Sequence, residues 1–303
     1  MTASACAKVI LLGEHAVVYG QPAVAVPLPQ IRAFVLPEPA AAFEISAPAA
    51  SPTPLTFDSP HPFIDLVRNL LSDLQAAPPP VRLTIQSQIP LASGMGSGAA
   101  IATALVRALA AYLGHSLSAE TVNSYVYETE RYFHGNPSGI DNTVIVFERP
   151  IRFVRGQPMQ ILESFAPFSL IVANTGAAAP TREVVADVKR LYDANAENIR
   201  SAVLQIGELA EEGLQALVDG DHLRLGALMT QNHNLLKTLT VSNAMLDTMV
   251  KTALNAGALG AKLSGGGRGG NMISLVDDAT SEPVMDALRK AGAAHIWKVT
   301  IAP

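Results

Sequence analysis

Three kinds of feature are scarce in this sequence, and each scarcity excludes a class of protein. Cys6 is the only cysteine among 303 residues, which excludes an intrachain disulfide and a cysteine-based metal site. Lysine and arginine number 21 against 26 acidic residues, a net charge of −5, which argues against general binding to nucleic acid or acidic membranes. No apolar run reaches membrane-spanning length. We therefore expect a cytoplasmic protein with neither nucleic acid nor membrane as a partner, and the single cysteine fits a reducing compartment.

The start of the chain does not have the pattern of a targeting segment. Its short apolar run, residues 9–12, is ended by Glu14 and His15. A signal peptide needs a longer apolar region and a small-residue cleavage site. We therefore expect these residues to belong to the folded protein.

The abundant residues indicate a large, mixed fold. The chain is 49% hydrophobic and 16% charged, and its length favours two domains over one. Strand-like and helix-like segments mix without strict alternation, which indicates the α+β class. Pro27 and Pro29 are expected to separate two short strands. The predicted strands are 7–12, 23–26, 31–36, 81–85, 144–147, 168–173, 272–276 and 295–300; the predicted helices are 63–74, one after the glycine turn near residue 96, 118–133, most of 181–256, and 281–291.

A glycine-rich turn lies between a predicted strand and an alanine-rich helix. Residues 93–98 read SGMGSG, with three glycines and two hydroxyls. Glycines let the backbone approach a ligand, and a helix N-terminus presents unpaired N–H groups and positive dipole. Such a turn binds phosphate, yet the pattern alone fits a plain strand-to-helix turn equally well. It is not a Walker A loop, because no Lys-Ser/Thr follows.

Four polar positions could carry chemistry, and each also has an ordinary structural explanation. Lys8 lies inside an apolar strand, where a lysine is usually an edge residue whose charge reaches solvent. Glu14 and His15 follow a glycine at a strand end and could form a surface pair. Glu130 lies late on a predicted helix and could belong to its solvated face. Asp141 lies where a helix could begin, and it could simply stabilise that helix start.

Taken together, the motifs carry a resemblance. Residues 8–20 (KVILLGEHAVVYG), 90–100 (PLASGMGSGAA) and 262–270 (KLSGGGRGG) occur in one order, with HGNPSGIDN at 134–142 between the last two. The chain resembles the GHMP kinase family over nearly its whole length, and within it the subgroup that phosphorylates mevalonate. Residues 174–182 are also similar to a family segment near the substrate.

The resemblance implies a fold and an activity. Residues 1–165 would form an N-terminal domain like ribosomal protein S5 domain 2, with the ATP loop and the catalytic aspartate. Residues 166–303 would form a ferredoxin-like C-terminal domain. The implied activity is ATP-dependent phosphorylation of the 5-hydroxyl of mevalonate, giving mevalonate 5-phosphate and ADP, with ATP and Mg²⁺ as cofactors.

The resemblance also implies roles for individual residues. Asp141 matches the general base and Lys8 the lysine beside it. Glu130 matches the Mg²⁺ ligand, and Ser97 is a second candidate donor to the metal. The residues on the substrate side would be Glu14, His15 and Thr181, and those of the ATP loop would be Pro90, Ala92, Ser93, Gly94, Met95, Gly96, Ser97 and Gly98.

The chain departs from the family pattern at two informative positions. Gly98 stands where relatives have a second serine that contributes to Mg²⁺ binding. Arg268 adds a charge to the C-terminal glycine cluster, where it could contact phosphate or face solvent. Two other functions stay open: a kinase for another small alcohol (mevalonate phosphate, homoserine or a sugar), and a catalytically silent ligand-sensing relative. The alanine-rich helices are also compatible with a homodimer.

Overall fold

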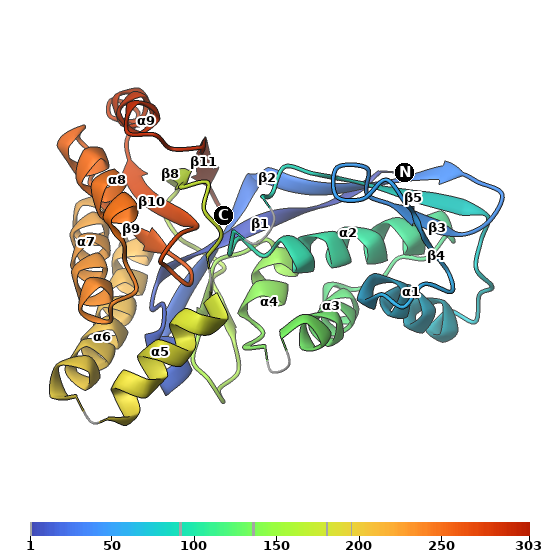
Figure 1. The fold of residues 1–303 in the computed structure, drawn as a ribbon, viewed down its shortest axis with the longest axis horizontal. Coiled ribbons are helices and arrows are strands. Elements are labelled where there is room, and N and C mark those ends of the chain that lie inside the picture. The colour runs from blue at the N-terminus through green and yellow to red at the C-terminus, as the bar shows by residue number, and fades with distance from the viewer. Residues whose placement is uncertain (1, 91–92, 135–136, 180, 195) are drawn as a thin grey trace. The chain divides into compact units, whose positions relative to one another are not determined.

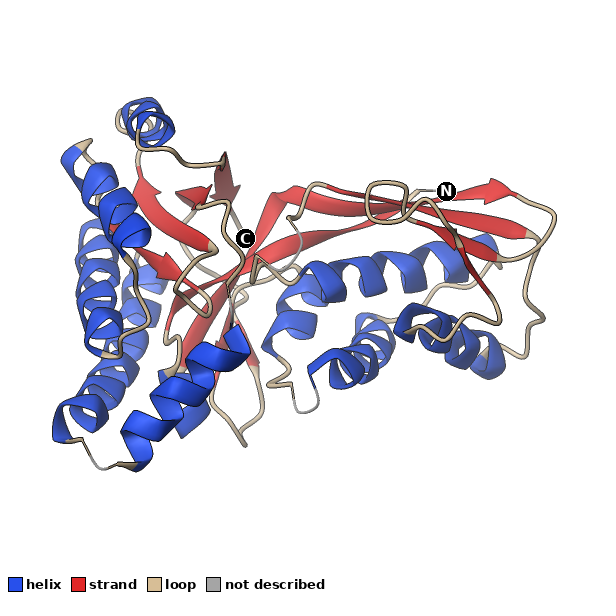
Figure 2. Cartoon of the chain, in the orientation of Figure 1, coloured by secondary structure: helices blue, strands red, loops and turns tan. Residues whose placement is uncertain are grey.

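The computed structural model describes residues 2–90, 93–134, 137–179, 181–194 and 196–303 (Figure 1). Helices and strands alternate irregularly along this part of the chain, so the predicted α+β class is confirmed (Figure 2). Within the described ranges, every helix is too short or too polar to cross a membrane.

The chain divides into two compact units, each made of several segments. Unit 1 comprises residues 1–7, 31–91 and 96–148, and unit 2 comprises residues 8–30, 92–95 and 149–303. The chain therefore passes from unit 2 to unit 1 inside the glycine turn, after Met95. The predicted division into residues 1–165 and 166–303 stays a prediction.

Unit 1 combines a sheet with a layer of helices. Strand β5 (Val81–Ser87) pairs antiparallel with the second half of β2 (Ala23–Pro39) and parallel with β3 (Glu44–Ser46), which pairs with β4 (Leu55–Thr56). Strand β1 (Ala3–Leu12) also pairs with β2. The helices of this unit are α1 (Pro62–Asp73), α2 (Ser97–Tyr112), α3 (Ala119–His134) and α4 (Ile140–Phe147), and α2 packs on both α3 and α4.

Two sequence predictions in this region are wrong. Residues 144–147 belong to helix α4, whereas their apolar, β-branched composition predicted a strand. A short apolar run has no periodicity that separates the two states. Likewise, β2 is one strand that includes Pro27 and Pro29. The ladder with β5 begins at Ala33 and that with β6 (Ile151–Phe153) ends at Ala25, so Pro27 and Pro29 lie between these two ladders, where a missing N–H costs neither of them a hydrogen bond.

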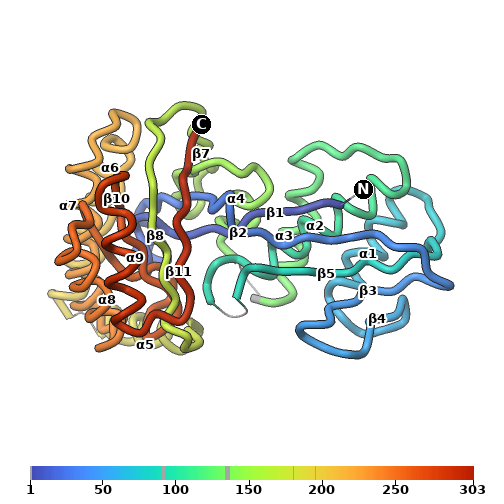
Figure 3. Tube along the Cα trace, turned by 90° about the horizontal axis from the view of Figure 1, so that it is seen from above, coloured from blue at the N-terminus to red at the C-terminus, as the bar shows by residue number. Residues whose placement is uncertain are grey.

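Unit 2 contains a four-stranded antiparallel sheet. The strands are β8 (Phe168–Asn174), β9 (Gly260–Ser264), β10 (Asn271–Val276) and β11 (His295–Ile301), in the order β11-β8-β10-β9. The two longest registers place β8 beside β11 and β10 (Figure 3). Between β8 and β9 the described residues form four helices: α5 (Thr181–Asp193), α6 (Glu197–Asp219), α7 (His222–Thr238) and α8 (Ala244–Asn255). Helix α9 (Ser281–Lys290) separates β10 from β11.

This connectivity confirms the expected ferredoxin-like topology. In chain order the elements run strand, helices, strand, strand, helix, strand. Across the sheet, the fourth of these strands lies beside the first, followed by the third and the second. Helices α7 and α8 pack on β9, and α8 also packs on β10. The apolar core between them includes Ile171, Leu236, Met249, Leu263 and Met272. A hairpin of β6 and β7 (Gln160–Ile161) and a 3₁₀ turn, η1 (Ala16–Tyr19), complete the unit.

Candidate active site

In unit 1, the second part of the glycine turn forms the start of helix α2. Gly96 is the N-cap residue and adopts a left-handed conformation, with φ of 74°, that suits glycine. Ser97 and Gly98 begin the helix, where the first N–H groups have no partner within it. The Ser97 hydroxyl is buried and has no hydrogen-bond partner among the described residues. This helix start therefore offers donors to an anion, and phosphate binding at the glycine turn stays a prediction.

Glu130 lies on α3, directly beside this helix start. Its side chain is buried, and a Cβ atom placed on Gly98 would lie 3.2 Å from Glu130 Oε1. The glycine thus lets the helix approach a buried carboxylate closely. A carboxylate and a hydroxyl oxygen are ligands that Mg²⁺ prefers, and Mg²⁺ usually takes only one or two from a protein. The residues present fit that metal.

Asp141 occupies the first turn of α4. The helix begins after Gly139, whose φ of 88° again favours glycine. A negative charge is favourable at a helix N-terminus. The next residue, Asn142, donates from Nδ2 to Asn123 Oδ1 on α3 at 2.7 Å, which fixes the start of α4 against that helix.

The other end of α4 is held by a charged network. Glu148 accepts two hydrogen bonds from Arg32 (2.9 and 2.8 Å) and one from Arg107 of α2 (3.2 Å). Arg107 also donates to the carbonyl oxygen of Val146, at 2.8 Å. Helices α2 and α4, which carry Ser97 and Asp141 at their starts, are therefore fastened together near their other ends.

In unit 2, the first part of the glycine turn rests on two strands. The backbone N–H of Lys8 in β1 donates to the carbonyl oxygen of Met95 (3.1 Å), and Asn271 Nδ2 donates to the carbonyl oxygen of Ser93 (2.7 Å). The Lys8 side chain is itself buried within this apolar strand. Gly94 has a φ of 79° and open space around it. These bonds fix the backbone that the ATP-loop prediction concerns.

Two residues of the predicted ATP loop, Pro90 and Ala92, are not among those whose contacts are given above. Pro90 lies in the segment after β5 and is partly exposed, and Ala92 lies outside the described residues. Lys8 and Asp141, the predicted catalytic pair, belong to different units. Their joint action on one hydroxyl therefore stays a prediction.

The turn after β1 places Glu14 and His15 in the interior of unit 2. Both side chains are buried, and His15 has a φ of 60°. His15 Nε2 donates to the carbonyl oxygen of Gly266 at 3.0 Å. Burial lowers the pKa of His15 to about 4, so the ring is neutral at pH 7. A surface position for this pair, the ordinary alternative, is excluded by the burial.

Glu14 forms an ion pair with Lys262 of β9, and both side chains are fully buried. Burial raises the pKa of Glu14 above its ordinary value, although the charge and hydrogen bond of Lys262 oppose this. Burial lowers the pKa of Lys262, and Glu14 opposes that shift. Each ion thus compensates the other in a site without solvent.

Thr181 approaches the same place from helix α5. A Cβ atom on Gly266 would lie 2.5 Å from Thr181 Oγ1 and 3.0 Å from Thr181 Cα. Only glycine allows this contact. Gly266 therefore touches both Thr181 and His15, so that the residues predicted on the substrate side gather around the C-terminal glycine loop within unit 2.

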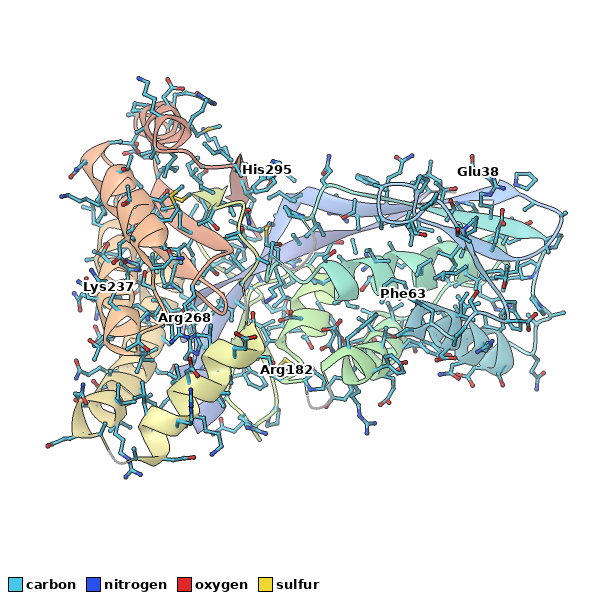
Figure 4. The ribbon with its side chains drawn as sticks, in the orientation of Figure 1. Glu38, Phe63, Arg182, Lys237, Arg268 and His295 are labelled. Atoms are coloured by element: carbon cyan, nitrogen blue, oxygen red, sulfur yellow. The ribbon has the colours of Figure 1, made fainter. Side chains whose placement is uncertain are left out.

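Arg268 has protein partners on two elements. Its guanidinium donates to Asp187 of α5 (2.6 Å) and to the carbonyl oxygen of Thr240 (3.1 Å). Figure 4 shows it beside α5. The arginine thus fastens the glycine loop to α5, the helix that begins at Thr181; a contact to phosphate stays a prediction.

Two residues of the site carried no role in the sequence reasoning. Lys262 appears in the sequence only as the first residue of the third motif, and Asn271 directly follows that motif. A lysine in an apolar strand and an asparagine at a strand start are weak signals alone. Asn271 also accepts from Asn174 Nδ2 at 2.7 Å, which joins β10 to β8. Both partners lie far away in the sequence, so only the fold shows these roles.

Comparison with known proteins identifies the family. Residues 63–149 match the GHMP kinases N terminal domain, and residues 213–294 match the GHMP kinases C terminal domain. A mevalonate kinase of Pyrococcus furiosus is 35% identical over 314 aligned positions, which cover 96% of this chain and 93% of the relative. The chain belongs to the GHMP kinase family. The resemblance seen in the sequence is confirmed.

Two further GHMP kinases are similar over nearly their full length. A mevalonate kinase of Thermococcus onnurineus is 33% identical, covering 98% of this chain and 96% of the relative. The crystal structure of L. major mevalonate kinase in complex with R-mevalonate has a TM-score of 0.87 and 27% identity, covering 100% of this chain and 96% of that one. The two-domain GHMP kinase fold is therefore confirmed as well.

Proposed function

We propose that this GHMP kinase transfers the γ-phosphoryl group of ATP to the 5-hydroxyl of mevalonate, giving mevalonate 5-phosphate and ADP. The observation that carries the proposal is that His15 and Thr181 both contact Gly266 in unit 2, while Glu14 lies buried beside His15 in the same turn. These residues match the substrate-side positions of the mevalonate subgroup. The similarity to mevalonate kinases over 96% of the chain supports the same substrate.

The side chains present suit phosphoryl transfer to an alcohol. An alcohol has a pKa far above 7, so its attack benefits from a base within hydrogen-bond reach. We assign this role to Asp141, with Lys8 lowering the hydroxyl pKa by its positive charge. The N–H groups at the start of α2 would orient the phosphates, because this reaction depends mainly on positioning and charge neutralisation.

The proposal extends to one metal ion. Glu130 and Ser97 would hold Mg²⁺, which neutralises phosphate charge when it is bound. Gly98 supplies no ligand in this chain, so a water molecule would take the place of the serine found in relatives. A homodimer and a cytoplasmic location stay predictions.

The test is a panel of acceptors. Purified protein is mixed with ATP and Mg²⁺, and ADP release is followed with mevalonate, mevalonate 5-phosphate, homoserine and galactose. We expect turnover with mevalonate alone. Turnover with another acceptor would replace the substrate and keep the enzyme class. Bound ATP without turnover on any acceptor would favour the ligand-sensing alternative.

A further inference from the structure

Lys262 is a buried charge that the proposed reaction does not use. It lies in the middle of β9, and its side chain has no exposed surface. Lysine is almost never fully buried unless it is paired. Its ammonium donates to Glu14 Oε1 and, at 2.8 Å, to the carbonyl oxygen of Leu263. Removing a charge from water costs free energy, and this cost points to a role for Lys262 other than packing.

The geometry of Glu14 shows what the pair leaves available. One carboxylate oxygen, Oε1, is bound by Lys262. The other, Oε2, is buried and has no hydrogen-bond partner among the described residues. The carboxylate also experiences the charge of Lys8. A buried acceptor without a partner is costly, and such groups often receive a ligand atom.

We propose that Lys262 is a positioning residue for phosphoryl transfer: it favours the ionised form of Glu14 and holds Oε1, so that Oε2 accepts a hydrogen bond from a hydroxyl of the acceptor alcohol. This inference deepens the proposed function and rests on it. Lys262 itself contacts no substrate atom. It acts through Glu14, from the strand that leads into the C-terminal glycine loop.

The rest of unit 2 holds this arrangement rigidly. Ser264, two residues after Lys262, donates to the carbonyl oxygen of Ile10 (2.9 Å) and accepts from its N–H (3.2 Å). Gly13 N–H donates to Asn232 Oδ1 of α7 at 3.3 Å. These bonds fix the chain before Glu14, and the bond from His15 to Gly266 fixes it after Glu14, so a change at Lys262 acts on a carboxylate that cannot easily move away.

The other titratable groups near Glu14 keep the same charge over the pH range of interest. Loss of Lys262 would therefore alter the titration of Glu14 itself. Burial lowers the pKa of His15, and that of His233 on α7, to about 4 in each case. Both rings are therefore neutral between pH 6 and pH 8.5. Lys8 on β1 faces Glu14, and Arg268 faces His15.

Two further charged side chains lie near His233, and they also keep one charge state over this pH range. Asp247 of α8 contacts His233 Nε2 at 3.2 Å, and Lys237 contacts Asp247 at 3.4 Å. Burial alone would raise the pKa of Asp247, but Ser242 and Lys237 lower it overall. Asp247 is therefore ionised from pH 6 to pH 8.5. The two histidines are neutral over the same range.

Removing Lys262 has a defined effect on Glu14. The charge that opposes the burial effect disappears, so the pKa of Glu14 rises further. In Lys262→Met, Glu14 therefore takes up its proton at a higher pH than in wild type, and its protonated fraction grows as the pH falls. A purely structural role for Lys262 would lower activity at every pH alike.

The decisive experiment compares wild type, Lys262→Met, Glu14→Gln and the double variant. We measure kcat/KM for mevalonate from pH 6 to pH 8.5 at saturating ATP. Lys262→Met should lose on the order of 10- to 100-fold more between pH 8.5 and pH 6 than wild type does. Glu14→Gln and the double variant should keep the wild-type profile at a lower level. A profile of Lys262→Met parallel to wild type would overturn the proposal.

Lys262→Arg covers the case in which Lys262→Met fails to fold. Arginine keeps the charge but changes the geometry of the ion pair. We expect a wild-type pH profile with a raised KM for mevalonate and an unchanged KM for ATP. Equal changes in both KM values would contradict a role directed at the acceptor.

Failure of the proposed function can be told apart from failure of this inference. If wild type prefers another alcohol, the substrate is wrong, and the pH comparison is made with that alcohol. If wild type phosphorylates none of the alcohols, the melting temperature of each variant is measured in place of its turnover. A raised folded-state pKa gives stability that is present below the unfolded value and lost as pH rises, so Lys262→Met should lose stability from pH 5 to pH 8 relative to the double variant. The same slope in both would overturn the inference.

Discussion

The network at the end of α4 predicts a large difference between two glutamates that both bind arginine. Glu148 accepts three hydrogen bonds from Arg32 and Arg107, and all three side chains are 22–30% exposed. Glu211 also binds an arginine, Arg152, but is 44% exposed. Hydrogen bonds to charged groups contribute about 1.5–3 kcal/mol each when buried. Discounted for solvent, Glu148→Gln should cost about 2–3 kcal/mol of unfolding free energy, and Glu211→Gln about 0–1 kcal/mol.

The pH dependence of this difference provides a second check. Burial alone would raise the pKa of Glu148, but the hydrogen bonds and charges of Arg32 and Arg107 outweigh it and lower the pKa below its ordinary value of 4.5. A lowered folded-state pKa gives stability that is complete above the unfolded value and lost as pH falls through the folded one. The effect of Glu148→Gln should therefore be full at pH 7 and shrink below pH 4.5.

Urea unfolding followed by circular dichroism measures both effects. The midpoint should move for Glu148→Gln without a change in slope, because the same surface is exposed on unfolding. Glu211→Gln, measured in parallel, is the matched control. Equal costs for the two variants, or a cost of Glu148→Gln that grows as the pH falls, would refute the reasoning.

Two further predictions concern glycines of the site. Gly266→Ala places a Cβ atom 2.5 Å from Thr181 Oγ1, so it should raise the KM for mevalonate and cost about 1–3 kcal/mol of stability; Gly265→Ala, whose Cβ atom meets open space at a φ of 92°, should cost about 1–2 kcal/mol of strain and leave that KM unchanged. Similar KM values for these two variants would contradict the contact. Gly98→Ser adds a hydroxyl beside Glu130 and should lower the Mg²⁺ concentration for half-maximal turnover about tenfold. Gly98→Ala adds the same Cβ atom without the oxygen, and an equal response would show that the hydroxyl is not a ligand.

Much of the fold could be predicted from local patterns. Helix α1 matches the predicted range within one residue because its apolar positions recur at helical spacing and Pro62 can occupy its first turn. Strands β8, β10 and β11 were likewise predicted from short, apolar, β-branched runs. Patterns of this kind depend on neighbours in the sequence, and here those neighbours were sufficient.

Features that depend on distant partners could not be predicted in this way. Strand β9 contains Gly260 and Lys262, which disfavour a strand, and it is stabilised by pairing with β10 and by the ion pair with Glu14. Helix α4 reads as a strand until its packing on α2 is known. Tertiary contacts override local preference in both cases.

In the candidate site, too, residues within motifs could be predicted, whereas a residue that depends on a distant partner could not. Motif resemblance predicted Glu14, His15 and Thr181 on the substrate side, and the structure places His15 and Thr181 against Gly266. The resemblance gave no role to Lys262, because the partner of this residue lies 248 positions away in the sequence. A motif records which residue types recur together, whereas the reason for a buried charge lies in its environment.

The most direct test of the central claim is the turnover of mevalonate by Asp141→Asn. Asparagine keeps the size of the side chain and the start of α4 but cannot accept the hydroxyl proton. With ATP affinity and melting temperature close to those of wild type, we predict that kcat falls about 10²- to 10⁴-fold. A variant that binds ATP, folds normally and phosphorylates mevalonate at the wild-type rate would contradict the assignment of Asp141 as the base of an alcohol kinase.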